Sequence, residues 1–160
     1  MIFKTKKHSS DLYSTLLVLS RNIFFYKTLK LADNFETRIY LMFFHFSIML
    51  TIFKDLKIKF HQNNYDSLFY NIENNLRELG FGDVSVNKKM KEYVNMFYAI
   101  LDKIEVTDMS IDENIANFFR KIFNLDKNIK FYANYYKKYN EYLSNNTLNN
   151  FTKDIINHNF

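Results

Sequence analysis

The 160-residue chain contains no proline, cysteine or tryptophan and only two glycines. Without cysteine, it has no disulfide framework, no thiolate nucleophile and no cysteine-ligated metal. Because proline and glycine are the residues that most often interrupt helices, their scarcity favours long, uninterrupted helices. Lysine, asparagine, isoleucine, phenylalanine and tyrosine are abundant instead, which is typical of a protein encoded by an AT-rich genome.

The chain is basic, with a formal net charge of +5 and an isoelectric point near 9.2. Such a charge ordinarily suggests an anionic partner, such as a nucleic acid or a membrane surface. A codon bias toward lysine supplies the same charge without any functional demand. The net charge therefore does not identify a partner.

Motifs for common catalytic and metal sites are also missing. The four histidines do not share helical metal-ligand spacing, and no HExxH, paired ExxH or DDxxD motif occurs. A phosphate-binding loop would need a strand before its glycines and Gly-Lys-Ser/Thr at their end, and the dinucleotide fingerprint would need a third glycine. We therefore expect no enzyme activity, metal, cofactor or small-molecule substrate.

Apolar residues recur at helical spacing along most of the chain, which predicts an all-α fold. We expect a compact single-domain bundle of about six helices, with Asn34 as the N-cap of the second. The predicted helices cover residues 10–26, 35–55, 63–79, 85–104, 111–123 and 126–143. The domain would span residues 1–143, and the asparagine-rich residues 144–160 would form a polar C-terminal tail.

The N-terminal residues lack the apolar core and cleavage site of a secretory signal. The longest apolar stretch is also shorter than the roughly 20 residues that a membrane-spanning helix needs. We therefore expect a soluble protein that contacts a membrane at most peripherally.

Both glycines, Gly80 and Gly82, lie in one short stretch between the third and fourth predicted helices. Glycine adopts positive φ without a steric penalty, and this conformation commonly ends a helix. We expect the backbone to need both glycines, so that the segment forms a tight corner. Ser85 is expected to cap the fourth helix, because its hydroxyl can accept a bond from a free N–H of the first turn.

Two interpretations of this corner remain open. The plainer one is a well-capped connection between two core helices. The alternative is a recognition surface facing a partner, formed by Arg77, Glu78, Asp83 and Lys88.

The second predicted helix is apolar on nearly all sides from Leu41 to Phe53, which is typical of a central, buried helix. His45 in its middle is expected to be a core histidine bonded to a neighbour rather than a ligand or catalyst. Arg38 precedes it by two turns on about the same face. If both project into one pocket, Arg38 needs an acidic partner, because an unpaired buried charge is costly. Its candidate partners are Asp33, Glu78 and Asp83.

Basic segments interleaved with aromatic residues occur at residues 27–30, 88–91 and 131–142. Such surfaces can bind RNA or anionic membranes. The same pattern arises when solvated lysines cover a tyrosine-lined core. Composition does not separate these cases, so a helical RNA- or ribosome-binding module is an alternative function.

Two stretches of the sequence resemble the ubiquinol–cytochrome c chaperone family. Residues 76–88, LRELGFGDVSVNK, match a long motif of that family almost residue for residue. Residues 12–50 resemble an earlier motif, in which Tyr26 ends a helix and His45 lies at the centre of the next one. The resemblance is strongest over residues 12–104.

Three positions depart from the family pattern. Ala32 stands where the family tends to have proline, and Thr37 and Asn87 stand where it tends to have glycine. We interpret these departures as drift away from GC-rich codons rather than loss of function.

The resemblance implies a binding protein rather than an enzyme. Proteins of this family, including alphaproteobacterial relatives of the mitochondrial factor, bind newly made cytochrome b and support assembly of the ubiquinol–cytochrome c reductase (complex III of the respiratory chain). The mitochondrial members act with a small partner protein near the ribosome exit and the inner membrane. For this chain, the resemblance implies a cytoplasmic chaperone of cytochrome b, peripheral at most to the cytoplasmic face of the inner membrane. The ribosome and a small assembly factor are further candidate partners.

The corner and the resemblance together lead to a hypothesis for the client-binding site. A groove between the helix over residues 35–55 and the glycine corner would hold a client segment between apolar walls. The residues expected at this site are Arg38, His45, Arg77, Glu78, Gly80, Gly82, Asp83 and Lys88.

Overall fold

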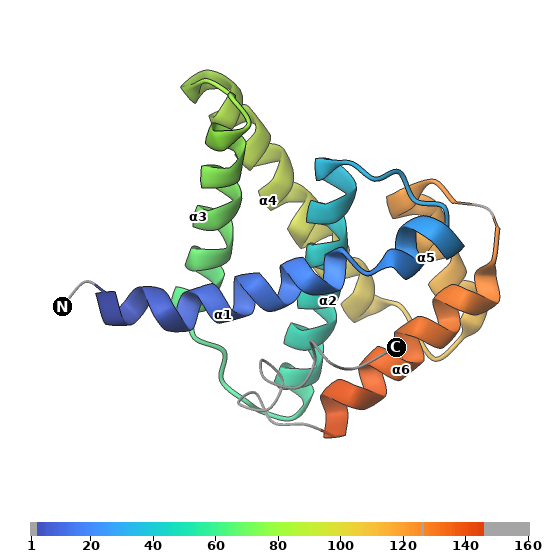
Figure 1. Ribbon diagram of the computed structural model, residues 1–160. Helices are drawn as coiled ribbons and strands as arrows, with labels where there is room; N and C mark the ends of the chain where they lie inside the picture. The colour runs from blue at the N-terminus through green and yellow to red at the C-terminus, as the bar shows by residue number, and fades with distance from the viewer. Residues whose placement is uncertain (1–2, 126, 146–160) are drawn as a thin grey trace.

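The computed structural model describes residues 3–125 and 127–145 of the protein. All regular elements in these residues are helical, so the predicted all-α fold is confirmed (Figure 1). The elements are α1 (Phe3–Ser20), the short π-helix η1 (Phe24–Thr28), α2 (Phe35–Asp55), α3 (Gln62–Glu78), α4 (Asp83–Val106), α5 (Asp112–Phe123) and α6 (Ile129–Asn145). Helix α6 includes the first two residues of the predicted tail, and the rest of that tail lies outside the described residues.

Helix α2 is the central helix and packs against α1, α4 and α6. Figure 1 shows α1 crossing α2, with the α3–α4 hairpin projecting on one side and α5 and α6 on the other. Every residue from Leu41 to Met49 is buried. Aromatic rings fill the space around it: Phe43 and Phe46 each lie 5.5 Å from the ring centre of Phe97 in α4. Since a fully buried phenylalanine contributes roughly 1.5–3 kcal/mol, these contacts make α2 the centre of the core.

The first helix differs from the prediction, which placed a single helix over residues 10–26. Helix α1 begins earlier and ends at Ser20, and the chain turns before η1. Asn22 causes part of this break, because its side-chain oxygen accepts a hydrogen bond from the backbone N–H of Phe24 at 3.0 Å. The ring of Phe24 then stacks on Tyr135 of α6 at 5.5 Å. Tertiary packing on α6 therefore favours a break that the helical periodicity does not show.

The N-caps of α2 and α4 give one confirmed prediction and one correction. Asn34 caps α2 as expected, because its side-chain oxygen accepts a hydrogen bond from the backbone N–H of Thr37 at 2.9 Å. The N-cap of α4 is Gly82 and not Ser85, which lies inside the helix. Starting the helix at Asp83 places its carboxylate in the first turn, where the helix dipole favours an anion.

Helix α3 ends in a Schellman motif at the glycine corner. The N–H of Phe81 donates to the carbonyl of Leu76 at 3.2 Å, and the N–H of Gly80 donates to the carbonyl of Arg77 at 3.0 Å. Gly80 has a φ of +94°, so the expectation of positive φ is confirmed there. It is wrong for Gly82, whose φ of −74° and ψ of 167° are open to any residue.

Helix α2 ends in the same motif without a glycine. The N–H of Ile58 donates to the carbonyl of Phe53 at 2.8 Å, and the N–H of Lys57 donates to that of Lys54 at 3.1 Å. Lys57 itself has a φ of 57°. Further non-glycine residues with positive φ are Lys30, Asn124 and Asn128. Because this chain uses lysine and asparagine at such positions, the sequence does not mark these helix ends.

The two glycines provide a matched test of backbone strain. Gly80→Ser should destabilise the fold by about 1–2 kcal/mol, because it forces a residue with a Cβ into positive φ. Gly82→Ser should be neutral or slightly stabilising, because serine adopts the observed angles and is a good N-cap. A Cβ at either position meets no other heavy atom within 4 Å, so steric clashes do not confuse the comparison. Urea unfolding measures both, and equal losses of stability would contradict the different roles assigned to the two glycines.

Candidate functional site

A cleft of about 510 Å³ opens between α1, α2 and the end of α3. This volume is within the range of about 300–1,000 Å³ that is typical of ligand sites. Half of its lining is apolar and consists of Leu17, Phe35, Ile39, Met42 and Leu79. The polar half consists of Tyr13, Arg21, Arg38, Asn75 and Glu78. We name it the α1–α3 cleft.

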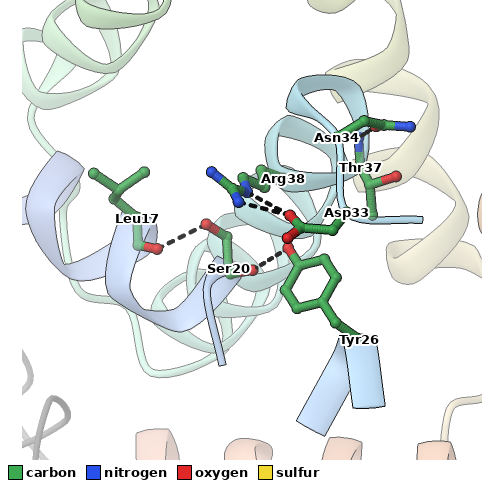
Figure 2. Close-up of polar contacts among 7 residues, drawn as sticks. All are labelled: Leu17, Ser20, Tyr26, Asp33, Asn34, Thr37 and Arg38. Carbon is green, nitrogen blue, oxygen red and sulfur yellow. Dashed lines mark hydrogen bonds and ion pairs between the residues drawn. The ribbon is translucent and has the colours of Figure 1, made fainter. Parts of the chain in front are cut away.

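Hydrogen bonds hold the end of α1 in place beside this cleft (Figure 2). The hydroxyl of Ser20 donates to the carbonyl of Leu17 at 2.7 Å, and the hydroxyl of Tyr26 donates to the carbonyl of Ser20 at 2.5 Å. The second bond links η1 to the last residue of α1. The break after α1 is therefore a bonded structure that positions the α1 wall of the cleft.

Arg38 projects from α2 and pairs with Asp33, one of the three acidic partners considered from the sequence (Figure 2). Its Nε and Nη2 donate to one carboxylate oxygen at 3.1 and 2.6 Å. The hydrogen bond with Asp33 raises the pKa of Arg38. This pair lies at the protein surface and not in a common pocket with His45, so the shared pocket that sequence spacing allowed does not form.

At the glycine corner, the side chain of Arg77 connects α3 to the start of α4. It donates to Glu73 at 3.0 Å and also to Asp83. Arg77 and Asp83 are exposed, as is Lys88 on α4, and none of these three lines the cleft. Of the charged residues predicted at the rim, the structure brings Arg38 and Glu78 to the cleft.

Three apolar side chains are exposed around the glycines instead. Leu79 is 58% exposed, Phe81 39% and Val84 85%. We name these three residues the apolar corner. Leu79 also lines the cleft, so the apolar corner and the α1–α3 cleft meet at this residue. Isolated exposed apolar residues are common, but a group of them beside a cleft is a candidate binding surface.

His45 is fully buried and does not line the cleft. Its Nδ1 lies 2.6 Å from the carbonyl of Leu41, and its Nε2 lies 2.6 Å from the hydroxyl of Tyr135. Since a carbonyl only accepts, Nδ1 carries the hydrogen, and Nε2 accepts from Tyr135. Burial lowers the pKa of His45 to about 4, so the ring is neutral near pH 7. The prediction of a bonded core histidine is confirmed, and neither ring nitrogen is available to a client.

Sequence reasoning missed Tyr13, Arg21 and Asn75 as cleft residues. The side chain of Asn75 donates to the hydroxyl of Tyr13, which joins the α1 and α3 walls. Their side-chain types are ordinary for helix surfaces, so no local signal distinguished them. The apolar corner did have a signal, because apolar residues flank both glycines where polar residues are usual in a turn.

A second cavity of about 470 Å³ lies between α2, the α4–α5 connection and α6. Its lining includes the carboxylates of Asp55, Glu105 and Asp108. Within the described part of the chain, no group of three or more His, Asp or Glu residues is placed to hold a metal ion. An apolar ligand in this cavity would bury these carboxylates without a partner, which is costly. The α1–α3 cleft, half of whose lining is apolar, is therefore the stronger candidate for binding an apolar segment.

Among the described helices, none combines the length and apolar character needed to cross a membrane.

Comparison with known proteins identifies the family of the chain and a solved structure with the same fold. The sequence model of the ubiquinol-cytochrome C chaperone family matches residues 27–124, which is more than half of the chain. The protein therefore belongs to the ubiquinol-cytochrome C chaperone family. The matched region includes Arg38, Glu78 and the whole apolar corner. The description of this family is that of a chaperone.

A solved structure shares the fold. The crystal structure of the Cbp3 homolog from Brucella abortus is similar with a TM-score of 0.72 at 20% sequence identity. The similarity covers 93% of this chain and 87% of the other. No curated protein sequence matches the chain.

The buried histidine predicts a specific pH dependence of stability. The pKa of His45 is about 4 in the folded state against a reference value of 6.5, so the unfolded chain binds this proton first as the pH falls. The stability from neutral His45, about 3 kcal/mol, is fully present above pH 6.5 and is lost as the pH falls from 6.5 to 4. His45→Gln should flatten this part of the profile of unfolding free energy, measured with urea.

Tyr135→Phe is the control for this prediction. It removes the hydroxyl that bonds Nε2 and should lower stability at neutral pH by about 1–3 kcal/mol. It leaves the ring buried, so the pH dependence should persist. A wild-type profile in His45→Gln would show that another group causes the loss of stability.

Proposed function

We propose that this protein is a non-enzymatic assembly chaperone that binds newly synthesised cytochrome b and supports biogenesis of the ubiquinol–cytochrome c reductase. The observation that carries the proposal is the α1–α3 cleft with the apolar corner that meets it at Leu79, within a chain of this chaperone family. A newly made membrane protein exposes long apolar segments, and covering them removes apolar area from water. A surface of this kind provides such cover.

Magnitudes indicate that the corner and the cleft act together. Completing the burial of Leu79, Phe81 and Val84 would contribute roughly 3–6 kcal/mol, because each is already partly covered. Micromolar affinity needs about 8 kcal/mol after the cost of association is met. The corner alone is therefore too small, and the apolar floor of the cleft has to supply the remainder.

The corner is also pre-organised for binding. The Schellman motif fixes the backbone at Gly80, and Arg77 bonds both Glu73 and Asp83 across the turn. A side chain presented on a fixed backbone loses less conformational entropy when it binds. In this proposal, Arg77 and Asp83 support the backbone of the corner and the apolar side chains contact the client.

A helical RNA- or ribosome-binding module is the second candidate. Its aromatic platform would lie on residues 131–142, but Tyr132, Tyr135, Tyr136 and Tyr139 are buried in the core. Buried rings are not available to stack on bases. The exposed Lys88 remains available to an anionic surface, and we propose contacts with the ribosome, a small assembly factor or the cytoplasmic face of the inner membrane only as additions to client binding.

Two valines on α4 provide a matched test of the client surface. Val84, at 85% exposure, belongs to the apolar corner, whereas Val106, at 74% exposure, lies at the opposite end of the helix. Val84→Asp should reduce capture of cytochrome b at least about tenfold, because client binding would bury an unpaired carboxylate. Val106→Asp should leave capture unchanged. Cytochrome b is translated in a cell-free system that contains mild detergent and one of the tagged variants. The measurement is the amount of cytochrome b that is recovered with each variant.

The controls separate the possible failures. Equal capture by both variants would show that the client binds elsewhere. No capture of cytochrome b by the wild-type protein would contradict the proposed function. Recovery of ribosomal components that dissociate steeply as salt increases would favour the second candidate, because phosphate contacts release counterions on binding.

A further inference from the structure

Arg21 differs from the other arginines in its ion pairing. Arg38 pairs with Asp33, Arg77 with Glu73 and Asp83, and Arg120 with Glu113. Within the described part of the chain, no carboxylate lies within 4.0 Å of the Arg21 guanidinium. Arg21 is the last α1-side residue of the cleft lining and is exposed to solvent there.

Glu78 is its counterpart on the α3 wall. It also lines the cleft, and no lysine, arginine or histidine of the described residues lies within 4.0 Å of its carboxylate. Both charges act on the hydroxyl of Tyr13: Arg21 lowers the pKa of this group and Glu78 raises it, while burial is the largest cause of its raised pKa. The two charges therefore lie near the same hydroxyl, one on each wall of the cleft.

The remaining charge of the cleft is already neutralised. Arg38 is paired with Asp33, so the lining carries one uncompensated cation directly after α1 and one uncompensated anion on α3. In the open cleft, water solvates both groups. An occupant that displaces this water has to supply the opposite charges, because desolvating an unpaired charge costs more than apolar contact returns.

We propose that Arg21 and Glu78 select and orient the occupant, so that the cleft binds a polypeptide segment whose apolar residues are flanked by an acidic side chain toward α1 and a basic side chain toward α3. This inference rests on the proposed function, since it specifies which part of the client binds. Opposite charges on two walls also define a direction for the segment, because the reversed segment would place like charges together.

A polypeptide fits this lining better than a small amphiphile. A fatty acid or a similar anion would form an ion pair with Arg21, but its apolar chain would cover Glu78 without providing a cation. The Tyr13 hydroxyl and the Asn75 amide lie between the charged walls and can exchange hydrogen bonds with peptide groups. The apolar corner continues the surface beyond the cleft, as an extended chain requires.

Charge reversal provides the test. Overlapping synthetic peptides that cover the organism's own cytochrome b are titrated against the wild-type protein by fluorescence anisotropy. We expect the tightest peptides to carry an acidic and a basic residue on either side of an apolar run. Arg21→Glu should weaken their binding at least about tenfold. Changing the peptide's acidic residue to lysine should restore the affinity for Arg21→Glu while weakening binding to the wild-type protein.

Glu78→Arg should give the mirror result, with rescue when the peptide's basic residue is changed to glutamate. Lys27→Glu is the matched control, because Lys27 is exposed but does not line the cleft. It should leave the peptide preference unchanged. If cytochrome b peptides bind but neither reversal is rescued, this inference is wrong while the proposed function stands. If none of them binds the wild-type protein, the proposed function fails and this inference with it.

Discussion

Because every residue of α2 from Leu41 to Met49 is buried, the remaining helices have to cover this helix on all sides. Helices α1, α4 and α6 do so directly, and the His45 ring contacts Tyr139 of α6 with ring centres 4.9 Å apart. Helix α3 packs mainly on α1 and α4, and it reaches α2 through Phe69, whose ring stacks on Phe43 at 5.6 Å. Beyond Phe69, the last turns of α3 line the α1–α3 cleft together with residues of α1 and α2. The candidate site follows from the way the core is covered.

The apolar corner lies beyond the reach of that core. Local interactions fix the backbone that carries its exposed side chains. These are the Schellman hydrogen bonds at Gly80 and the ion pairs of Arg77. Local bonds of this kind fix direction without burying apolar area, so the surface can be rigid and still available. The proposed client surface needs both properties, because a flexible surface would lose entropy on binding and a buried one could not bind.

The sequence predicted the helices well because their apolar periodicity is strong. It also predicted that His45 is buried and hydrogen-bonded, because a single histidine in an apolar helix needs a polar partner. The break after α1 was missed, since it depends on Asn22 and on packing against α6, which is distant in sequence. The prediction of Ser85 as N-cap was wrong. It rested on the preference of serine for N-cap positions, whereas the extended backbone of Gly82 starts the helix three residues earlier. Only Arg38 and Glu78 of the expected charged rim reach the cleft. Which face of α1 and α3 meets α2 is a tertiary property, so Arg21 had no sequence signal.

The structure accommodates Thr37 and Asn87, two of the residues expected to depart from the family pattern, whereas the backbone at Gly80 needs glycine. The backbone N–H of Thr37, not its side chain, bonds Asn34, so any residue with an N–H serves there. Asn87 is inside α4, where glycine would cost roughly 0.5–1 kcal/mol relative to alanine. Asparagine at this position therefore lacks nothing that the helix needs. At Gly80, the φ of +94° makes any Cβ unfavourable, whatever the space around it. A glycine-poor composition thus leaves this residue where the backbone of the corner requires it.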